Sequence, residues 1–136
     1  MANIKRIDHV AIAVDATSSD RFSDIPEANG ALHLIDRFLD EVIQHYQPDI
    51  NNVFLLGFSQ GTILSTAYAL NHPEKVQHVV ALSGYVNEQL IQKPLEKQRF
   101  KNLDFFIYPG PDRHDYTCTL YISHANLCCI SKTTVV

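Results

Sequence analysis

A serine lies between two glycines at residues 57–61, which read Gly-Phe-Ser-Gln-Gly. An apolar run precedes this G-x-S-x-G stretch, and a segment of helical character follows it. A serine in a sharp strand-to-helix turn is presented to substrate, and the helix dipole and free amides favour negative charge beside it. We therefore predict that Ser59 is a nucleophile and that the Gln60 amide is one donor to an oxyanion. The alternative is a tight turn in which the serine is incidental.

The two glycines have a predicted steric purpose. Such a turn forces the serine backbone into an unfavourable region, and side chains two residues before or after it would collide with the neighbouring strand or helix. We therefore expect both Gly57 and Gly61 to be needed for close packing.

Short apolar runs predict the strands that position Ser59. They occupy residues 52–56, 78–82 and 103–107, with a further short run at 10–14. After Asn52, the apolar character of the run at residues 52–56 is typical of a strand covered on both faces in a parallel sheet.

Two helices are predicted between these strands. The first starts at Asp24-Ile25-Pro26-Glu27, where Asp24 can cap and Pro26 fits the first turn, and it ends before Pro48. The second covers residues 62–71 and is stopped by His72-Pro73, and residues 87–102 contain a helix or an irregular excursion. The alternation predicts an α/β fold with a doubly wound, mostly parallel sheet. The first helix carries one apolar stripe: Leu32, Ile35, Leu39, Val42, Ile43 and Tyr46.

Composition excludes several classes of protein. With 136 residues, 46% of them hydrophobic, and a formal charge of -4, the chain is typical of one globular domain without the basic stripe that binds nucleic acid. The apolar run at 10–14 is too short for an export signal or for stable membrane insertion, so we expect a cytoplasmic protein. Cys118, Cys128 and Cys129 lack the spacing of a metal site and fit a reducing compartment.

The stretch from Phe54 to Val86 resembles the phospholipase/carboxylesterase family of α/β-hydrolases, which includes the acyl-protein thioesterases. The G-x-S-x-G stretch, the stop at His72-Pro73 and Ala-Leu-Ser-Gly-Tyr at 81–85 all match that family's pattern. Thr62 departs from it, because many members carry glycine there, although a hydroxyl can be tolerated. The resemblance implies a partial α/β-hydrolase fold, a mostly parallel sheet flanked by helices, with early and late strands missing.

The resemblance also implies a serine hydrolase that cleaves carboxylic esters or thioesters through an acyl-enzyme on Ser59. Its substrate would be a small-molecule or lipid acyl ester, and no metal or organic cofactor would be needed. Ser83-Gly84 stands where the family keeps a strand end near the acyl pocket, or is an ordinary strand-to-turn signal.

The remaining members of a catalytic triad are less well placed. In the family the aspartate follows the strand that corresponds to the third one here, and that position falls on Arg113. Asp112, one step earlier, is the best candidate, and Asp115 is the reserve. The family's histidine would follow beyond the end of this sequence, which leaves His124 and His114 as downstream candidates; either can instead be an incidental loop residue.

We therefore expect a partial hydrolase domain at residues 1–107 and an irregular tail at 108–136. Codon degeneracy allows the tail to be an out-of-frame reading, a hypothesis that the coding DNA would test. Without a matched histidine, we expect little activity from this chain. The alternative function is an inactive fragment or interaction module that associates with itself through an exposed sheet edge.

Overall fold

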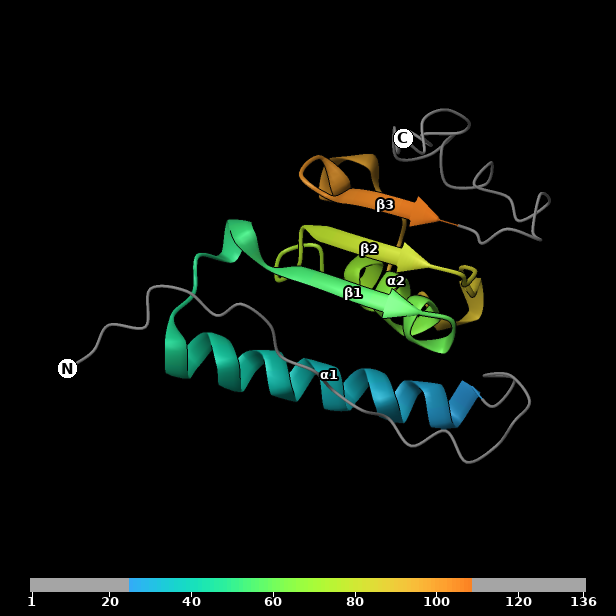
Figure 1. The fold of residues 1–136 in the computed structure, drawn as a ribbon, viewed down its shortest axis with the longest axis horizontal. Coiled ribbons are helices and arrows are strands. Elements are labelled where there is room, and N and C mark those ends of the chain that lie inside the picture. The colour runs from blue at the N-terminus through green and yellow to red at the C-terminus, as the bar shows by residue number, and fades with distance from the viewer. Residues whose placement is uncertain (1–24, 109–136) are drawn as a thin grey trace.

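The computed structural model describes residues 25–108, in which helices and parallel strands alternate (Figure 1). The predicted strand at residues 10–14, the capping residue Asp24 and the tail from residue 109 lie outside this range. In chain order the helices and strands are α1 (Ile25–Tyr46), a 3-10 helix (Ile50–Asn52), β1 (Phe54–Phe58), α2 (Gln60–Asn71), β2 (His78–Leu82), two 3-10 helices (Glu88–Leu90 and Lys97–Phe100) and β3 (Asp104–Tyr108).

The three strands form one parallel sheet in the order β1-β2-β3. Phe58, Leu82 and Tyr108 are register partners, so the carboxyl ends of the strands lie side by side. The prediction for β2 is confirmed, whereas β1 and β3 begin and end slightly later than predicted. For residues 87–102, the sequence predicted a helix or an irregular excursion. The structure has the irregular excursion, which contains only short 3-10 helices.

Helix α1 contributes the first half of its predicted apolar stripe, in chain order, to the core. Ala28 and Ala31, together with Leu32, Ile35 and Leu39 from the predicted stripe, are buried. Tyr46 is 43% exposed, so the stripe does not continue to the end of the helix as predicted. Val42 and Ile43, just before it in the stripe, are half-buried, so burial decreases toward the end of the helix.

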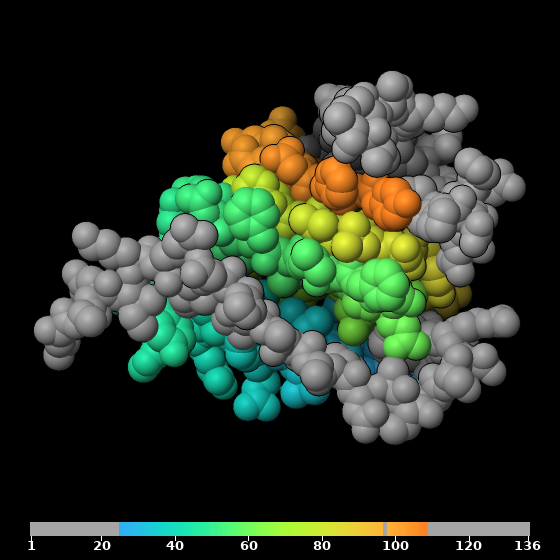
Figure 2. All heavy atoms as spheres, viewed as in Figure 1, coloured from blue at the N-terminus to red at the C-terminus, as the bar shows by residue number. Residues whose placement is uncertain are grey.

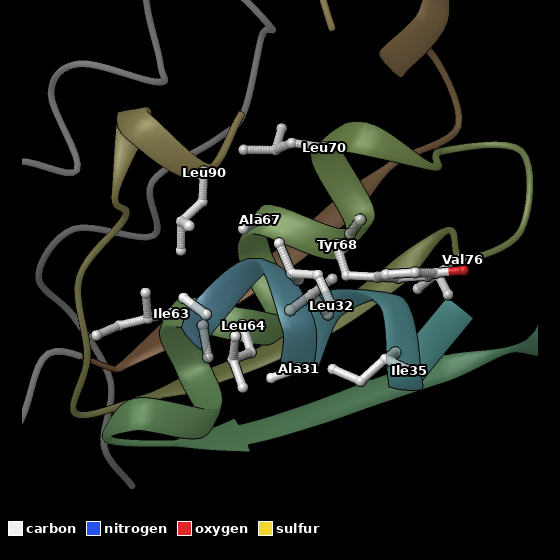
Figure 3. Close-up of a cluster of buried hydrophobic side chains, with 14 of the residues drawn as sticks. Ala31, Leu32, Ile35, Ile63, Leu64, Ala67, Tyr68, Leu70, Val76 and Leu90 are labelled. Carbon is white, nitrogen blue, oxygen red and sulfur yellow. The ribbon is translucent and has the colours of Figure 1, made fainter. Parts of the chain in front are cut away.

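Helix α2 is the centre of the molecule, because every residue from Thr62 to Asn71 is buried. It contacts β1 and β2 on one side and α1 on the other. Figure 3 shows side chains of α1 and α2 meeting in this core, with Val76 and Leu90 at its margins. The helix carries apolar side chains together with buried polar ones that are hydrogen-bonded, which suits such a central position.

The opposite face of the sheet is open in the described part of the chain, which corrects the prediction that β1 is covered on both faces. Phe54, Leu56 and Phe58 of β1 are 61%, 69% and 66% exposed. The side chains of Phe106 and Tyr108 in β3 are also exposed to solvent. Figure 2 shows side chains of all three strands on this face. The apolar run of β1 therefore supplies one packed face and one open apolar face.

Among residues 25–108, no helix has the length and apolar character needed to cross a membrane.

Candidate active site

Ser59 lies in the turn between β1 and α2, where it is the N-terminal cap of the helix. Its backbone has φ 53 and ψ -112, a conformation that non-glycine residues rarely adopt. The residue is exposed, and its side chain makes no capping hydrogen bond. The sharp, strained turn predicted from the sequence is therefore present, and it leaves the hydroxyl available.

The two glycines of the turn have different roles. A Cβ at Gly57 would lie 2.5 Å from the Thr62 nitrogen and closer still to the carbonyl group of Gly61. These are backbone atoms that cannot easily move, so a side chain at Gly57 is excluded. A Cβ at Gly61 would meet nothing within 4 Å. The prediction that Gly61 is needed for close packing is therefore wrong: its backbone is approached by Gly57, but its own side-chain position faces open space.

Gln60 provides the first amide of α2. The amides of a first helical turn have no carbonyl partner within the helix, and they carry the positive end of the helix dipole. The Gln60 N–H follows Ser59 directly in the chain, which is the position from which a donor can reach an oxyanion formed on the serine.

Backbone hydrogen bonds tie the turn to the neighbouring strand. The Ser59 N–H donates to the Leu82 carbonyl at 2.9 Å, and the Thr62 N–H donates to the Ser59 carbonyl at 3.1 Å. The Thr62 hydroxyl lies 2.8 Å from the Gly57 carbonyl and 2.7 Å from the Leu82 carbonyl. Thr62 was identified from the sequence only as a tolerated departure from a family pattern. Its burial between two strand ends is known only from the structure.

Ser83, at the end of β2, is a second strained serine beside the turn. Its φ is 51, and its N–H donates to the Tyr108 carbonyl at 2.7 Å. A Cβ at Gly84 would lie 2.7 Å from the Ser59 carbonyl. The predicted Ser83-Gly84 position therefore lies against the turn that carries Ser59. Nothing in the sequence indicated the strain at Ser83.

The candidate triad partners Asp112 and His124, and the reserves Asp115 and His114, lie outside the described residues. Within residues 25–108, no histidine hydrogen-bonds to Ser59. His78 does pair with a carboxylate, Asp104, at 3.4 Å, but both lie at the amino ends of their strands. Ser59 follows the carboxyl end of β1, about 15 Å away along a strand of this length. This pair is therefore on the wrong edge of the sheet to act on Ser59.

A second cluster of ionisable groups connects α1 and α2. Asp36 accepts hydrogen bonds from the Tyr68 hydroxyl at 2.7 Å and from the Lys75 ammonium at 2.8 Å. Burial alone would raise the pKa of Asp36, but the hydrogen bonds and the charge of Lys75 outweigh it and lower that pKa. Lys75 also contacts Asp40 at 2.6 Å, and burial raises the pKa of Tyr68. These groups satisfy one another, which indicates a structural role.

No group of three or more metal-ligating side chains occurs within the described residues.

The family comparison agrees with this geometry. A comparison with protein families matches residues 19–115 to the α/β-hydrolase fold. This match covers most of the 136 residues and includes every helix and strand from α1 to β3. The chain therefore belongs to the α/β-hydrolase fold family, which is a family of hydrolases. A search of curated proteins found no match to this chain.

Proposed function

We propose that the protein is a serine hydrolase of the phospholipase/carboxylesterase type, which cleaves carboxylic esters or thioesters through an acyl-enzyme on Ser59. The observation that carries the proposal is the strained, exposed Ser59 at the N-terminus of α2, whose side chain makes no capping hydrogen bond. A small-molecule or lipid acyl ester in the cytoplasm is the proposed substrate. Phe58, 66% exposed and adjacent to Ser59, supports an apolar acyl group.

The proposed reaction has two steps. The Ser59 oxygen attacks the acyl carbonyl carbon while a base takes its proton, and the base then gives that proton to the departing alcohol or thiol. Water, activated by the same base, then attacks the acyl-enzyme and releases the acid. The Gln60 N–H would donate to the oxyanion in both steps. In this proposal His124 is the candidate base and Asp112 the candidate orienting carboxylate, with His114 and Asp115 as the reserves; all four lie outside the described residues.

Ester and thioester hydrolysis by the full chain tests this assignment. Ser59→Ala should lower the rate by several orders of magnitude, because the members of a triad act as a unit. His124→Ala should lower it as far. Ser65→Ala, a serine inside α2, is the matched control and should retain the rate. Undiminished turnover in Ser59→Ala would overturn the proposal.

The open face of the sheet favours a second candidate, an inactive interaction module that associates with itself. Phe54 and Leu56 are exposed on β1, which is an edge strand of the described sheet. An apolar edge strand of this kind promotes association. The full chain should then sediment as an oligomer, and Leu56→Lys should shift it toward monomer. A monomer at all concentrations would argue against this candidate.

A fluorophosphonate probe separates the two candidates, because it labels serines that a base has activated. Fast labelling of Ser59 in the full chain would show that a base is present and would exclude the inactive module. A folded protein in which Ser59 labels no faster than Ser65 would instead exclude the hydrolase.

A further inference from the structure

The Thr62 side chain occupies a fixed place between the ends of two strands. It is 3% exposed, and its hydroxyl reaches the carbonyl of Gly57 in β1 and the carbonyl of Leu82 in β2. A single hydroxyl proton shared between two carbonyls holds both of them near one point. Thr62 therefore joins the carboxyl ends of β1 and β2 through a side chain that belongs to α2.

The same Leu82 carbonyl also accepts the Ser59 N–H. The acceptor that fixes the Ser59 backbone is therefore itself held by Thr62. The Thr62 N–H donates in turn to the Ser59 carbonyl. Thr62 therefore contacts Ser59 through its main chain, and through its side chain it contacts the Leu82 carbonyl that holds the Ser59 N–H.

Gly84 makes room for this arrangement. A Cβ there would lie 2.6 Å from Thr62 Cγ2 and closer still to Thr62 Cβ. The Thr62 methyl group thus fills the space that the missing side chain of Gly84 leaves. A glycine at residue 62 would provide neither the hydroxyl nor the methyl group.

We propose that Thr62 is a positioning residue for Ser59, which it keeps in the strained conformation by clamping Gly57 and Leu82 together. The structural part of this inference concerns the backbone conformation of Ser59 and does not depend on whether Ser59 is a nucleophile. Its consequence for reaction rate rests on the proposed function, in which Ser59 is the nucleophile.

Thr62→Val tests the clamp, since it replaces the hydroxyl with a methyl group of similar size. Exchange of the Ser59 amide hydrogen should become about tenfold faster, as expected for loss of one hydrogen bond. Labelling of Ser59 by a fluorophosphonate should slow by a similar factor. Thr62→Ser, which keeps the hydroxyl, should restore both rates toward those of the wild-type chain.

Thr66→Val is the matched control. Thr66 is also a buried threonine of α2, but its hydroxyl donates to the Thr62 and Ile63 carbonyls within the helix. This variant should leave exchange and labelling at Ser59 unchanged. Equal effects of Thr62→Val and Thr66→Val would show general loosening of α2 and would overturn the clamp.

A measurement on the wild-type chain covers the case in which Thr62→Val does not fold. The Thr62 hydroxyl and the Ser59 N–H donate to one carbonyl, so NMR should show a slowly exchanging hydroxyl proton with a cross-peak to that amide. Failure to observe the cross-peak in a folded, assigned protein would overturn the clamp. The proposed function is tested separately: unreactive Ser59 with the clamp intact would reject the hydrolase alone.

Discussion

The two ends of α2 carry polar side chains in two different situations. At the start of the helix, Ser59 has a strained backbone and a hydroxyl without a capping bond. Toward its end, Tyr68 donates to Asp36, which also pairs with Lys75. Ser59 is fixed through its backbone, and its hydroxyl is left exposed. The side chains of Tyr68, Asp36 and Lys75 instead form hydrogen bonds with one another.

This difference separates a candidate for chemistry from a structural contact. Strained conformations persist only where surrounding contacts enforce them, and they concentrate at functional sites. The turn at Ser59 is enforced by close backbone packing at Gly57 and by hydrogen bonds to Leu82. The ionic cluster needs no such enforcement. Substitutions in the turn should therefore disturb geometry, whereas substitutions in the cluster should change stability and its dependence on pH.

Gly57→Ala should have the largest effect on stability. Its Cβ would overlap the backbone of Gly61 and Thr62, which the helix and the sheet hold in place. We expect a loss of about 3 kcal/mol in the free energy of unfolding, at the upper end for overpacking. Chemical denaturation of the full chain measures this loss.

Gly61→Ala is the control for that substitution. The new methyl group would enter open space in the first turn of α2, so the free energy of unfolding should rise by about 0.5 kcal/mol or stay unchanged. A loss as large as that of Gly57→Ala would contradict the different roles that we assign to the two glycines.

The contrast between Gly57 and Gly61 also shows how far the sequence alone leads. The strand-to-helix context of Ser59 was predictable, because hydrophobic periodicity and helix stops are local signals. Which glycine is sterically required was not, since that depends on the distance between α2 and β1. The clamp by Thr62 and the strain at Ser83 likewise depend on how neighbouring strands align. The open face of β1 was missed because an apolar run does not reveal how many of its faces are covered.

Asp36→Ala should destabilise the protein by about 2 kcal/mol, because it leaves the buried hydroxyl of Tyr68 without its acceptor. Asp40→Ala is the matched control: Asp40 is more exposed and shares Lys75 with Asp36. Its loss should cost less than about 1 kcal/mol. Equal losses in the two unfolding experiments would show that the Tyr68 hydroxyl is not what makes Asp36 important.

The smallest effect concerns pH. The pKa of Asp36 in the folded chain lies below its ordinary value of 3.8, despite burial, because Lys75 and Tyr68 hydrogen-bond to the carboxylate. A lowered pKa means that the ionised form favours folding. The contribution of Asp36 is therefore present above pH 3.8 and is lost as the pH falls through its folded value.

Asp36→Asn isolates this contribution, because the amide oxygen can still accept from Tyr68 but carries no charge for Lys75. Near neutral pH, wild type should exceed the variant by about 1 kcal/mol in the free energy of unfolding, a modest value because the pair is partly exposed. The difference should shrink as the pH falls below 3.8. Glu74 also has a lowered pKa, but it is present in both chains and cancels in the comparison. A difference that stays constant with pH would mean that Lys75 stabilises the helices through packing of its stem rather than through its charge.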